Sequence, residues 1–268
     1  NSKNRLSITT GEHKEGANNI LRLDGLYLDS GNTLGDTDTL NQPIFECYNK
    51  FDRIVFQSEY AKKVYEAFTD KEKPNKIIYN GVQDLFFDND ESIDKPEGFD
   101  KVIIASSKWR RHKRIEECIE AFKDKRLKNI ALVILGGYRN VDMKNVFTLP
   151  MIPPSDLPMY YKMADAMIHI SWLDCCPNSV VEALACKLPV ICSHNGGTPE
   201  LVKGDGIVLQ LEEDYKYGEK VDLYNPPKVD IETIISGILK CLEIGPIETR
   251  NDLRISTASK QYSELFTY

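Results

Sequence analysis

Short apolar runs rich in β-branched residues alternate with longer amphipathic segments along most of this chain. The apolar runs, such as KVIIAS at 101–106 and IALVILGG at 130–137, have the length and composition of buried strands. The segments between them, such as RIEECIEAFKD at 114–124, carry apolar residues at helical spacing. Because near-continuous apolar strands that alternate with helices need cover on both faces, the pattern predicts parallel sheets in an α/β fold.

One segment interrupts this alternation. DNDESIDKPEGFD at 88–100 is acidic, contains Pro and Gly and has no apolar period, which is typical of a linker. We therefore predict two Rossmann-like domains, the first of them reduced, because only about three strands precede the linker. The predicted boundaries are 1–90 and 100–245, with a C-terminal helix within 246–268 that could cross back to the first domain.

The individual elements follow from the same pattern. The predicted strands are 19–25, 52–58, 75–81, 101–106, 130–137, 145–150, 166–171, 189–194 and 206–210. The predicted helices are 41–51, 59–68, 114–124, 156–164, 177–187 and 230–243.

The composition limits the class of protein. Hydrophobic residues make up 41% of the 268 residues and charged residues 28%, and no apolar run approaches the roughly 18 residues of a membrane span. The formal net charge of −7 weighs against a general binder of nucleic acid or anionic membranes. The seven cysteines include no C-x-x-C pair and predict reduced thiols. These features predict a cytoplasmic protein, with a position at the inner membrane surface left open.

Two stretches that follow predicted strands carry unusual chemistry, and the first is SSKWRRHKR at 106–114. Five of the seven residues from 108 to 114 are Lys or Arg. Because cations at the start of a helix oppose its macrodipole, the run indicates a bound anion, most simply a phosphate. A solvated basic turn is one alternative. A nucleic-acid groove is another, weakened by the net negative charge and by the single Trp109 that could stack a base.

The second stretch is DCCPNSVVEALACKLP at 174–189, where the proline suits the first position of a predicted helix. The unpaired N–H groups of Asn178 and Ser179 would attract an anion. Asp174 precedes this helix end, and Glu182 lies about 7 Å further along the axis at ~1.5 Å per residue. This order matches the sugar hydroxyls, diphosphate and ribose hydroxyls of a nucleotide-sugar. A turn role for Asp174 and a buried, backbone-satisfied Glu182 stay open as alternatives.

These residues also carry a resemblance to a known family. SWLDCCPNSVVEALACKLPV resembles the E-x7-E signature of the retaining family-4 glycosyltransferases, which have the GT-B fold. FDRIVFQSEYAKKVYEAF and NKIIYNGV resemble the last segments before the hinge of that family. SKWRRHKRIEECIEAF resembles its phosphate-binding loop and helix, and NGGTPELV its G-G-x-P-E loop. The resemblance covers about residues 20–85 and 101–210.

The resemblance implies a role for each matching residue. The positions that match the family's donor site are Lys108, Lys113, Asp174, Asn178, Ser179 and Glu182. Lys113 matches the lysine on the diphosphate, with Lys108 near the position of an assisting arginine. Asn178 and Ser179 match the helix start that meets the phosphate. Asp174 matches the acid on the transferred sugar, and Glu182 the acid on the ribose. Lys113 and Asp174 are the catalytic candidates.

The chain also departs from the family pattern. Asp174 stands where Glu is usual and Lys108 where Arg is usual, which shortens one contact and removes a bidentate donor from the other. The N-terminal half lacks the family's glycine-rich start. Arg22 and Asp24, which end the predicted strand 19–25, are our substrate-binding candidates from that half, although Asp24 could equally serve a turn.

No metal site is predicted. Asp36 and Asp38, and likewise Asp88 and Asp90, imitate the D-x-D motif of another glycosyltransferase fold, but we interpret them as solvated acids of a loop and of the linker. The histidines show no metal-ligand spacing. His169 is interpreted as a strand residue, and His112 as part of the basic loop.

The predicted function is a hexosyltransferase-type reaction. A sugar moves from a nucleotide diphosphate donor to the hydroxyl of a glycan, a lipid-linked or another acceptor. The resemblance implies retention of anomeric configuration and no cofactor. Peripheral membrane association is left open, and nucleic acid is not expected as a partner. A GT-B-fold epimerase and a nucleotide-sugar binding module without transfer activity are the alternatives.

Overall fold

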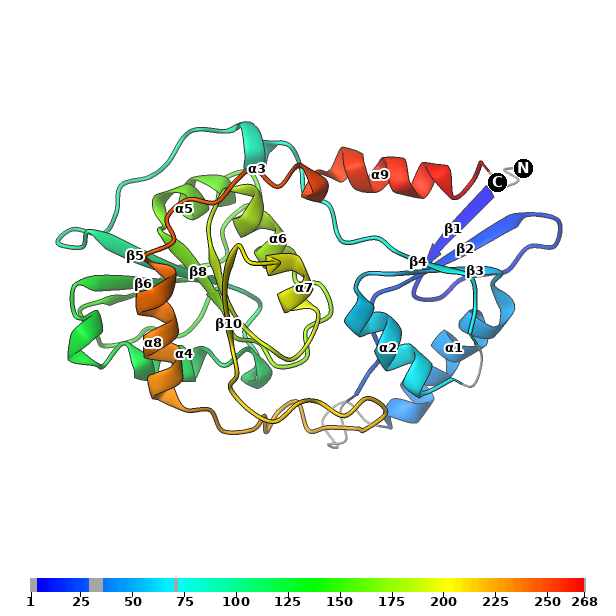
Figure 1. Ribbon diagram of the computed structural model, residues 1–268, viewed down its shortest axis with the longest axis horizontal. Coiled ribbons are helices and arrows are strands. Elements are labelled where there is room, and N and C mark those ends of the chain that lie inside the picture. The colour runs from blue at the N-terminus through cyan, green and yellow to red at the C-terminus, as the bar shows by residue number, and fades with distance from the viewer. Residues whose placement is uncertain (1–3, 29–35, 70–71, 268) are drawn as a thin grey trace.

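The computed structural model of the chain describes residues 4–28, 36–69 and 72–267. Its described part contains two sheets that lie side by side (Figure 1). The first has four strands in the order β1-β2-β3-β4, and the second has six in the order β10-β9-β8-β5-β6-β7. Neighbouring strands in both sheets run parallel. This is the parallel-sheet α/β fold that the alternation predicts.

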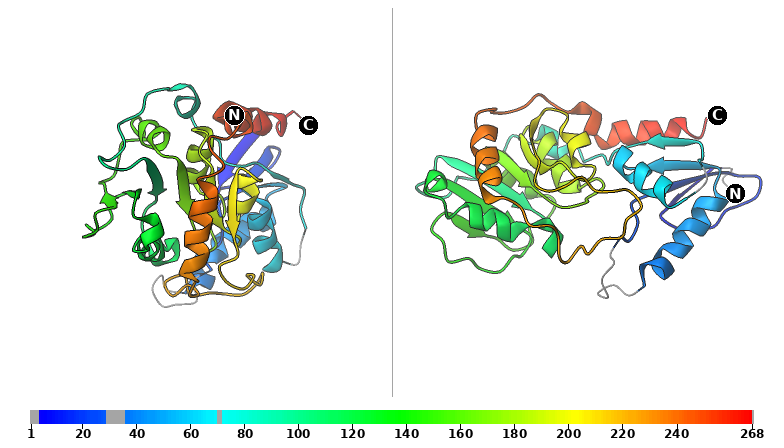
Figure 2. Two further views of the ribbon diagram at one scale, coloured as in Figure 1. Left: turned by 60° about the vertical axis from the view of Figure 1, so that its left-hand side comes forward. Right: turned by 60° about the horizontal axis from the view of Figure 1, so that its bottom comes forward.

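The first sheet and its helices form what we call the N-terminal unit. Its strands are β1 (Asn4–Ile8), β2 (Asn18–Leu23), β3 (Arg53–Phe56) and β4 (Asn75–Ile77). Helices α1 (Thr37–Lys50) and α2 (Glu59–Ala67) cover one face, where they pack on Leu21, Ile54 and Phe56. The opposite face, with Ile20 and Val55, packs against helix α9 (Ile255–Glu264) (Figures 1 and 2).

Two predictions for this unit are corrected by the structure. Four strands precede the linker instead of about three, because β1 is an edge strand whose half-exposed alternation gives no continuous apolar run. Helix α1 starts at Thr37 instead of residue 41. The Asp36 carboxylate accepts from the Asp38 N–H at 3.1 Å, so this exposed acid also caps the helix.

The second sheet and its helices form the C-terminal unit. Its strands are β5 (Lys101–Ser106), β6 (Ile130–Leu135), β7 (Val146–Thr148), β8 (Ala166–His169), β9 (Val190–Ser193) and β10 (Gly206–Leu209). Its helices are α4 (Ile115–Ala121), α5 (Leu157–Met163), α6 (Asn178–Ala185), α7 (Thr198–Val202) and α8 (Ile231–Cys241). Short 3₁₀ turns are η1 (Arg111–Lys113), η2 (Lys125–Leu127) and η3 (Asn251–Leu253).

Apolar residues fill both faces of this sheet, so its strands read as continuous hydrophobic runs. That is why strand β5 was predicted with its observed limits. The short helix α7 was not predicted, since its five residues are too few to show an amphipathic period.

Three segments of the described chain connect the two units. Helix α3 (Leu85–Asp88) and the linker after it lead from β4 to β5. Residues 250–254 return along this crossing, where the Val82 N–H donates to the Leu253 carbonyl at 2.9 Å, and α9 then runs over the first sheet (Figure 1). Arg254 pairs with Asp88 at 2.8 Å, so Asp88 is ion-paired instead of merely solvated. The third is a loop of residues 212–228, which we call the strap; it leaves the C-terminal unit after β10, contacts the N-terminal unit and returns to α8.

Candidate functional site

A cleft of about 500 Å³ lies where strand ends of the two units meet. The N-terminal unit contributes residues at or just beyond the carboxyl ends of β2, β3 and β4, and the C-terminal unit contributes residues at the ends of β5 and β8 and at the start of α6. Ligands of open parallel sheets bind at this edge, because the carboxyl ends of the strands and the starts of the following helices converge there.

The structure brings all the sequence-predicted site residues to this one cleft. They are Arg22, Asp24, Lys108, Lys113, Asp174, Asn178, Ser179 and Glu182. Three acids, two lysines and an arginine, drawn from both units, therefore border a single cleft, as a shared ligand would require.

One end of the cleft is built around Asp174. Its carboxylate contacts the Lys113 ammonium group and lies 3.4 Å from Nε2 of His169. Burial opposes ionisation of Asp174, but the charge of Lys113 and the contact with His169 outweigh it and hold the carboxyl pKa well below its usual range. Burial also lowers the pKa of His112, to about 4, and of His169, so both imidazoles are neutral at pH 7. Asp174 thus stays ionised and basic groups surround it.

A glycine pair lets a neighbouring loop approach Asp174 closely. The Gly197 N–H donates to the Asp174 carbonyl at 2.7 Å. A Cβ on Gly197 would lie 1.9 Å from the Cys175 carbonyl oxygen, and Gly196 has a positive φ of 99°. No other residue fits these two positions without backbone movement. The loop that holds them therefore fixes the backbone that carries Asp174.

The other end of the cleft is built around Glu182, on α6. The Tyr161 hydroxyl donates to its carboxylate at 2.9 Å. Burial raises the pKa of Glu182, an effect that the Tyr161 hydrogen bond opposes. The alternative in which backbone groups satisfy Glu182 is not what the structure shows, since a tyrosine side chain does so and the carboxylate still borders the cleft.

Helix α6 begins at Asn178, between these two ends. Pro177 precedes the helix as its N-cap instead of occupying the predicted first helical position, which leaves the starting N–H groups at Asn178 and Ser179. These N–H groups have no intrahelical acceptor and carry the positive end of the helix dipole. The exposed Lys108 also borders the cleft, at the end of β5. An anion between the two acids would meet backbone donors and lysine.

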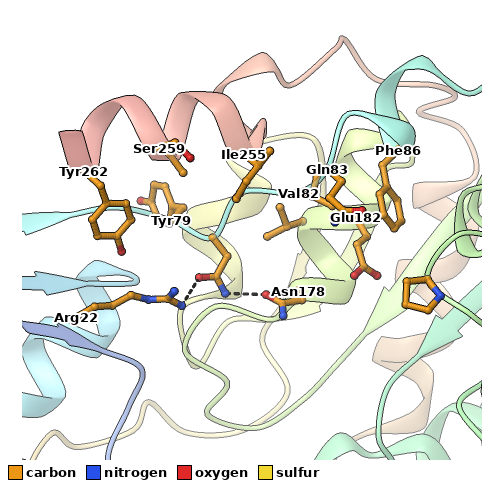
Figure 3. Close-up of a pocket in the computed structure, with 15 residues that line it drawn as sticks. Arg22, Tyr79, Val82, Gln83, Phe86, Asn178, Glu182, Ile255, Ser259 and Tyr262 are labelled. Carbon is orange, nitrogen blue, oxygen red and sulfur yellow. Dashed lines mark hydrogen bonds between the residues drawn. The ribbon is translucent and has the colours of Figure 1, made fainter. Parts of the chain in front are cut away.

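A chain of hydrogen bonds joins the N-terminal unit to this helix start. The Arg22 guanidinium lies 3.0 Å from the Asp24 carboxylate and donates to the Asn80 side-chain oxygen at 2.9 Å. The Asn80 amide donates to the Asn178 side-chain oxygen at 2.7 Å (Figure 3). Arg22 and Asp24 are thus held against the cleft by pairing with each other and with Asn80.

Several further residues of the site were not among the sequence-predicted ones. His169, Asn80 and Gln57 all border the cleft, and Gln57 donates to Asp24. Each lies at, or one to three residues beyond, the carboxyl end of a strand. The strand-end rule could have found His169, which is the last residue of its strand. Asn80 and Gln57 carry no charge and gave no other signal.

Glu200 is a missed residue of another kind, because it joins the units outside the cleft. Its carboxylate accepts the backbone N–H groups of Glu59 and Tyr60, at 2.7 and 2.6 Å. These N–H groups open helix α2, so the C-terminal unit supplies a helix cap to the N-terminal unit.

The basic run at 108–114 divides in the fold. Only Lys108 and Lys113 line the cleft, while Arg111 pairs with Glu117 at 2.6 Å and Arg114 is buried. Trp109 donates to the Leu135 carbonyl at 2.9 Å. Because the cations point in different directions and the Trp109 indole is engaged, the run does not form the continuous basic, stacking surface of a nucleic-acid groove.

Two smaller hollows adjoin the cleft. One of about 410 Å³ shares Glu182 with it and is bordered by Tyr79 and by Tyr262 of α9 (Figure 3). The other, of about 340 Å³, shares Asp174 and Lys113 with it and is bordered by Tyr27. A hollow thus adjoins the cleft beside each of these two acids.

Neither a metal centre nor a membrane span is found in the part of the chain that the structure describes. Over residues 4–28, 36–69 and 72–267, no three His, Cys, Asp or Glu side chains come together as metal ligands would. In the same residues no helix is long and apolar enough to cross a membrane.

Two parallel-sheet units that face each other across such a cleft define the GT-B fold of glycosyltransferases. The structure is similar to that of sucrose-phosphate synthase from Thermosynechococcus elongatus, with a TM-score of 0.70 and 16% identity over 93% of this chain and 67% of that one. It is also similar to Anabaena Alr3699/HepE in complex with UDP-glucose, with a TM-score of 0.60 and 17% identity over 92% of this chain and 71% of that one.

Residues 87–222 match the family described as glycosyl transferases group 1, and the chain belongs to that family. Spore coat protein SA of Bacillus subtilis is 30% identical over 127 residues, which are 45% of this chain and 30% of that protein. Uncharacterized glycosyltransferase MJ1607 of Methanocaldococcus jannaschii is 26% identical over 69% of this chain and 51% of its own length. The chain therefore spans at most about half the length of these two relatives.

Proposed function

We propose that the protein transfers a sugar from a nucleoside diphosphate sugar to an acceptor hydroxyl, as a hexosyltransferase that retains anomeric configuration and needs no metal ion or other cofactor. The observation that carries this proposal is the single cleft that collects eight predicted residues around a helix start. The similarity to a structure described as a complex with UDP-glucose supports a donor of this class.

In the proposed complex the diphosphate lies at the start of α6. The N–H groups of Asn178 and Ser179 donate to it, and Lys108 and Lys113 supply positive charge. Glu182 accepts from the ribose hydroxyls at one end, and Asp174 accepts from the transferred sugar at the other. Lys113, which contacts Asp174, thereby stands between the sugar and the leaving diphosphate.

The reaction breaks the bond between the anomeric carbon and the diphosphate oxygen and forms a bond from that carbon to the acceptor oxygen. The bonding electrons leave with the diphosphate, and the acceptor hydroxyl passes its proton to the oxygen of that departing diphosphate. Lys113 and the α6 N–H groups stabilise the charge that develops on the diphosphate, work that preorganised donors do best in a water-poor site. Asp174, kept ionised by its neighbours, orients the sugar.

We place the acceptor in the smaller hollow beside Asp174. This hollow is bordered by Asp24, Gln57 and Tyr27, which can bond to hydroxyl groups, and it opens directly onto Lys113 and Asp174. A glycan or a lipid-linked acceptor fits this chemistry. The reduced acceptor-side domain at 1–90, the nucleotide-sugar-binding domain at 100–245 and a cytoplasmic or membrane-surface location stay predictions.

The first test is a thermal-shift screen of nucleoside diphosphates and their sugars. A ligand present at 100 times its Kd adds about 2.7 kcal/mol to the free energy of unfolding. The wild type should be stabilised by one nucleoside series, Glu182→Gln less so, and the control Glu120→Gln, an exposed acid on α4, as much as the wild type. If no nucleotide or nucleotide-sugar stabilises the wild type, the donor site is wrong.

Product analysis then separates the alternatives. A transferase releases nucleoside diphosphate only with an acceptor, or slowly by hydrolysis. An epimerase changes the nucleotide-sugar with no acceptor present, and a binding module leaves it unchanged. Retention is read from the anomeric configuration of the product by nuclear magnetic resonance.

A further inference from the structure

Arg114 follows Lys113 directly, yet its side chain points away from the cleft into the C-terminal unit. The side chain has no exposed surface. Its backbone is left-handed, with φ 55° and ψ 35°, and joins the turn η1 to helix α4. A residue other than glycine is disfavoured in this conformation, and a buried guanidinium is costly without partners. Its partners therefore have to compensate for both.

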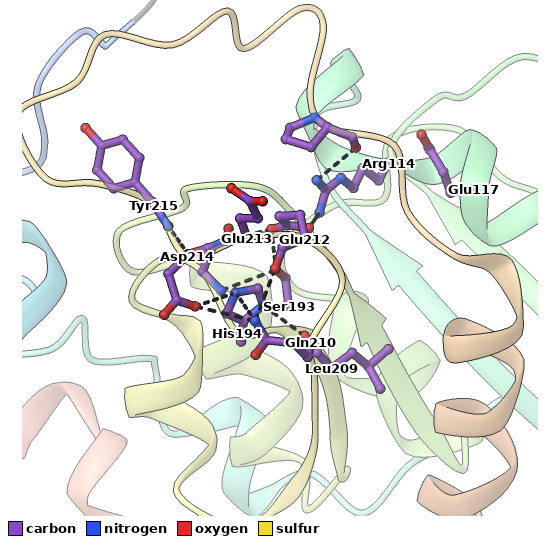
Figure 4. A network of polar contacts seen from close by, with 12 residues as sticks. Arg114, Glu117, Ser193, His194, Leu209, Gln210, Glu212, Glu213, Asp214 and Tyr215 are labelled. Carbon is purple, nitrogen blue, oxygen red and sulfur yellow. Dashed lines mark hydrogen bonds and ion pairs between the residues drawn. The ribbon is translucent and has the colours of Figure 1, made fainter.

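The partners of Arg114 are the two ends of the strap. Its Nη1 lies 2.8 Å from Oε2 of Glu212, which begins the strap, and its Nη2 donates to the carbonyl of Pro227, near the strap's end, at 3.2 Å (Figure 4). The other oxygen of Glu212 accepts from Asn195 at 2.9 Å and Ser193 at 3.3 Å. One buried guanidinium thus closes the base of the whole loop.

The strap reaches the N-terminal unit between these ends. Its Val221 N–H donates to the Leu28 carbonyl at 2.8 Å, and Lys220 pairs with Asp38 at 2.6 Å. The Tyr217 ring lies 5.9 Å from that of Tyr60 on α2.

The strap also packs on the segment that leads to Asp174. Its Tyr215, Val221 and Leu223 join a hydrophobic cluster with Trp172 and Leu173. The Trp172 N–H donates to the carbonyl of His112, in the basic turn, at 2.8 Å. The lysine and the acid of the cleft are therefore both supported from the strap side.

We infer that Arg114 and Glu212 are positioning residues that set Lys113 against the donor site, and that through them the strap couples the placement of the N-terminal unit to that lysine. Loss of the Glu212 charge leaves the Arg114 guanidinium buried without its counter-ion. The left-handed conformation at Arg114 is then no longer held in place, and the adjacent Lys113 shifts from its position in the cleft. If the strap loses its contacts with the N-terminal unit, its far end moves, and this movement reaches the same guanidinium through the Pro227 carbonyl. The consequence for catalysis rests on the proposed donor site, but the structural coupling does not.

The first experiment compares two Glu→Gln variants of the whole chain. Glu212→Gln removes the buried counter-ion. Glu232→Gln is the matched control, because Glu232 pairs with Arg126 at 2.6 Å in the same unit but on the surface. Amide hydrogen exchange in residues 110–114 and in 213–226 should become about tenfold faster in Glu212→Gln and stay unchanged in Glu232→Gln. The Kd for inorganic pyrophosphate should rise about tenfold in Glu212→Gln alone.

The second experiment changes only exposed strap residues, so it also serves if Glu212→Gln does not fold. Tyr217→Ser/Lys220→Ser cuts the contacts with α2 and Asp38 and leaves the strap's base intact. We expect faster exchange in residues 110–114 and a severalfold weaker affinity for pyrophosphate. Unchanged exchange there, with faster exchange confined to the strap, overturns the coupling. If exchange is coupled but pyrophosphate binds neither protein, the donor site fails and the positioning inference stands.

Discussion

Asp174 and Glu182, two of the three acids that line the cleft, have opposite environments although they are only eight positions apart in the sequence. Asp174 contacts Lys113 and His169, and its pKa is held below the usual range. Glu182 has a tyrosine hydroxyl as its neighbour, and burial raises its pKa. The carboxyl group of Asp174 therefore ionises more easily than an ordinary carboxyl group, and that of Glu182 ionises less easily. The comparison teaches that pairing, and not burial alone, decides the charge of an acid in this cleft.

This difference fits the proposed roles. An ionised Asp174 beside two neutral histidines and a lysine can hold sugar hydroxyls next to the bond that breaks. Glu182 becomes a better acceptor when a ligand's hydroxyls replace the hydration that burial has removed. Protein groups thus already stabilise the charge of Asp174, whereas in the proposed complex the hydroxyls of the donor stabilise the charge of Glu182.

The largest effect is expected from removing Lys113, the cation that contacts Asp174. Lys113→Met leaves Asp174 largely buried without its ion-pair partner and should lower the free energy of unfolding by about 3 kcal/mol. Turnover should fall at least about 100-fold, as for a lost group that stabilises the transition state. Urea unfolding and product assays measure both. The double variant Lys113→Met/Asp174→Asn should regain most of the stability, and no regain would mean that the ion pair is not the cause.

The next largest effects distinguish the proposed roles of Asp174 and Glu182, because one variant should lower turnover and the other should weaken nucleoside diphosphate affinity. Asp174→Asn should lower turnover about 100-fold with nucleoside diphosphate affinity nearly unchanged, because the partner proposed for Asp174 is the transferred sugar. Glu182→Gln should weaken nucleoside diphosphate affinity about tenfold, the worth of a hydrogen bond to a charged group. Isothermal titration and steady-state kinetics on the two variants test this. Equal effects of both variants on both quantities would contradict the assignment.

A smaller effect concerns pH. The raised pKa of Glu182 means that the folded state favours its neutral form, so this contribution is fully present below the unfolded value of about 4.5 and is lost as pH rises through the folded pKa. Glu182→Gln stays neutral and should be more stable than the wild type at pH 7 but not at pH 4.

Asp174 should behave in the opposite sense. Its lowered pKa stabilises the fold above the unfolded value of about 3.8, and this contribution is lost as pH falls through the folded pKa. Asp174→Asn should therefore be less stable than the wild type at pH 7. Urea unfolding at pH 7 and pH 4 checks both signs, and a shared sign for the two variants would remove the contrast.

The smallest effect is expected at Tyr161, the partner of Glu182. Tyr161→Phe removes one hydrogen bond to the carboxylate and should cost about 1 kcal/mol of stability, with a severalfold loss of nucleoside diphosphate affinity. Tyr160→Phe is the adjacent control and should change neither quantity.

Much of the fold could be predicted because the C-terminal strands are buried on both faces. Continuous apolar runs such as 101–106 are recognisable as buried strands from the sequence. Strand β1 exposes alternate residues at a sheet edge and was therefore missed. For the site, charged residues at strand ends could be selected one at a time. Their grouping in one cleft followed from parallel topology, which brings the carboxyl ends of strands to one edge.

The basic run shows where such prediction ends. Lys113 and Arg114 are adjacent and carry the same charge, yet one borders the cleft and the other is buried against Glu212, 98 positions further along the chain. No local pattern distinguishes them, because the difference comes from a left-handed turn and a partner supplied by a distant loop. Asn80 and Gln57 likewise take their roles from neighbours that only the folded chain provides.

Residue order is enough to predict the alternation of strands and helices, and with it the parallel sheets and the edge where polar residues gather. Periodicity and residue type are local properties, so they can be recognised without the fold. Which charges meet, which acid stays ionised and how the strap joins the two units follow only from the folded chain. Those outcomes depend on desolvation and on Coulomb interactions between residues far apart in the chain, and both exist only once the chain is folded.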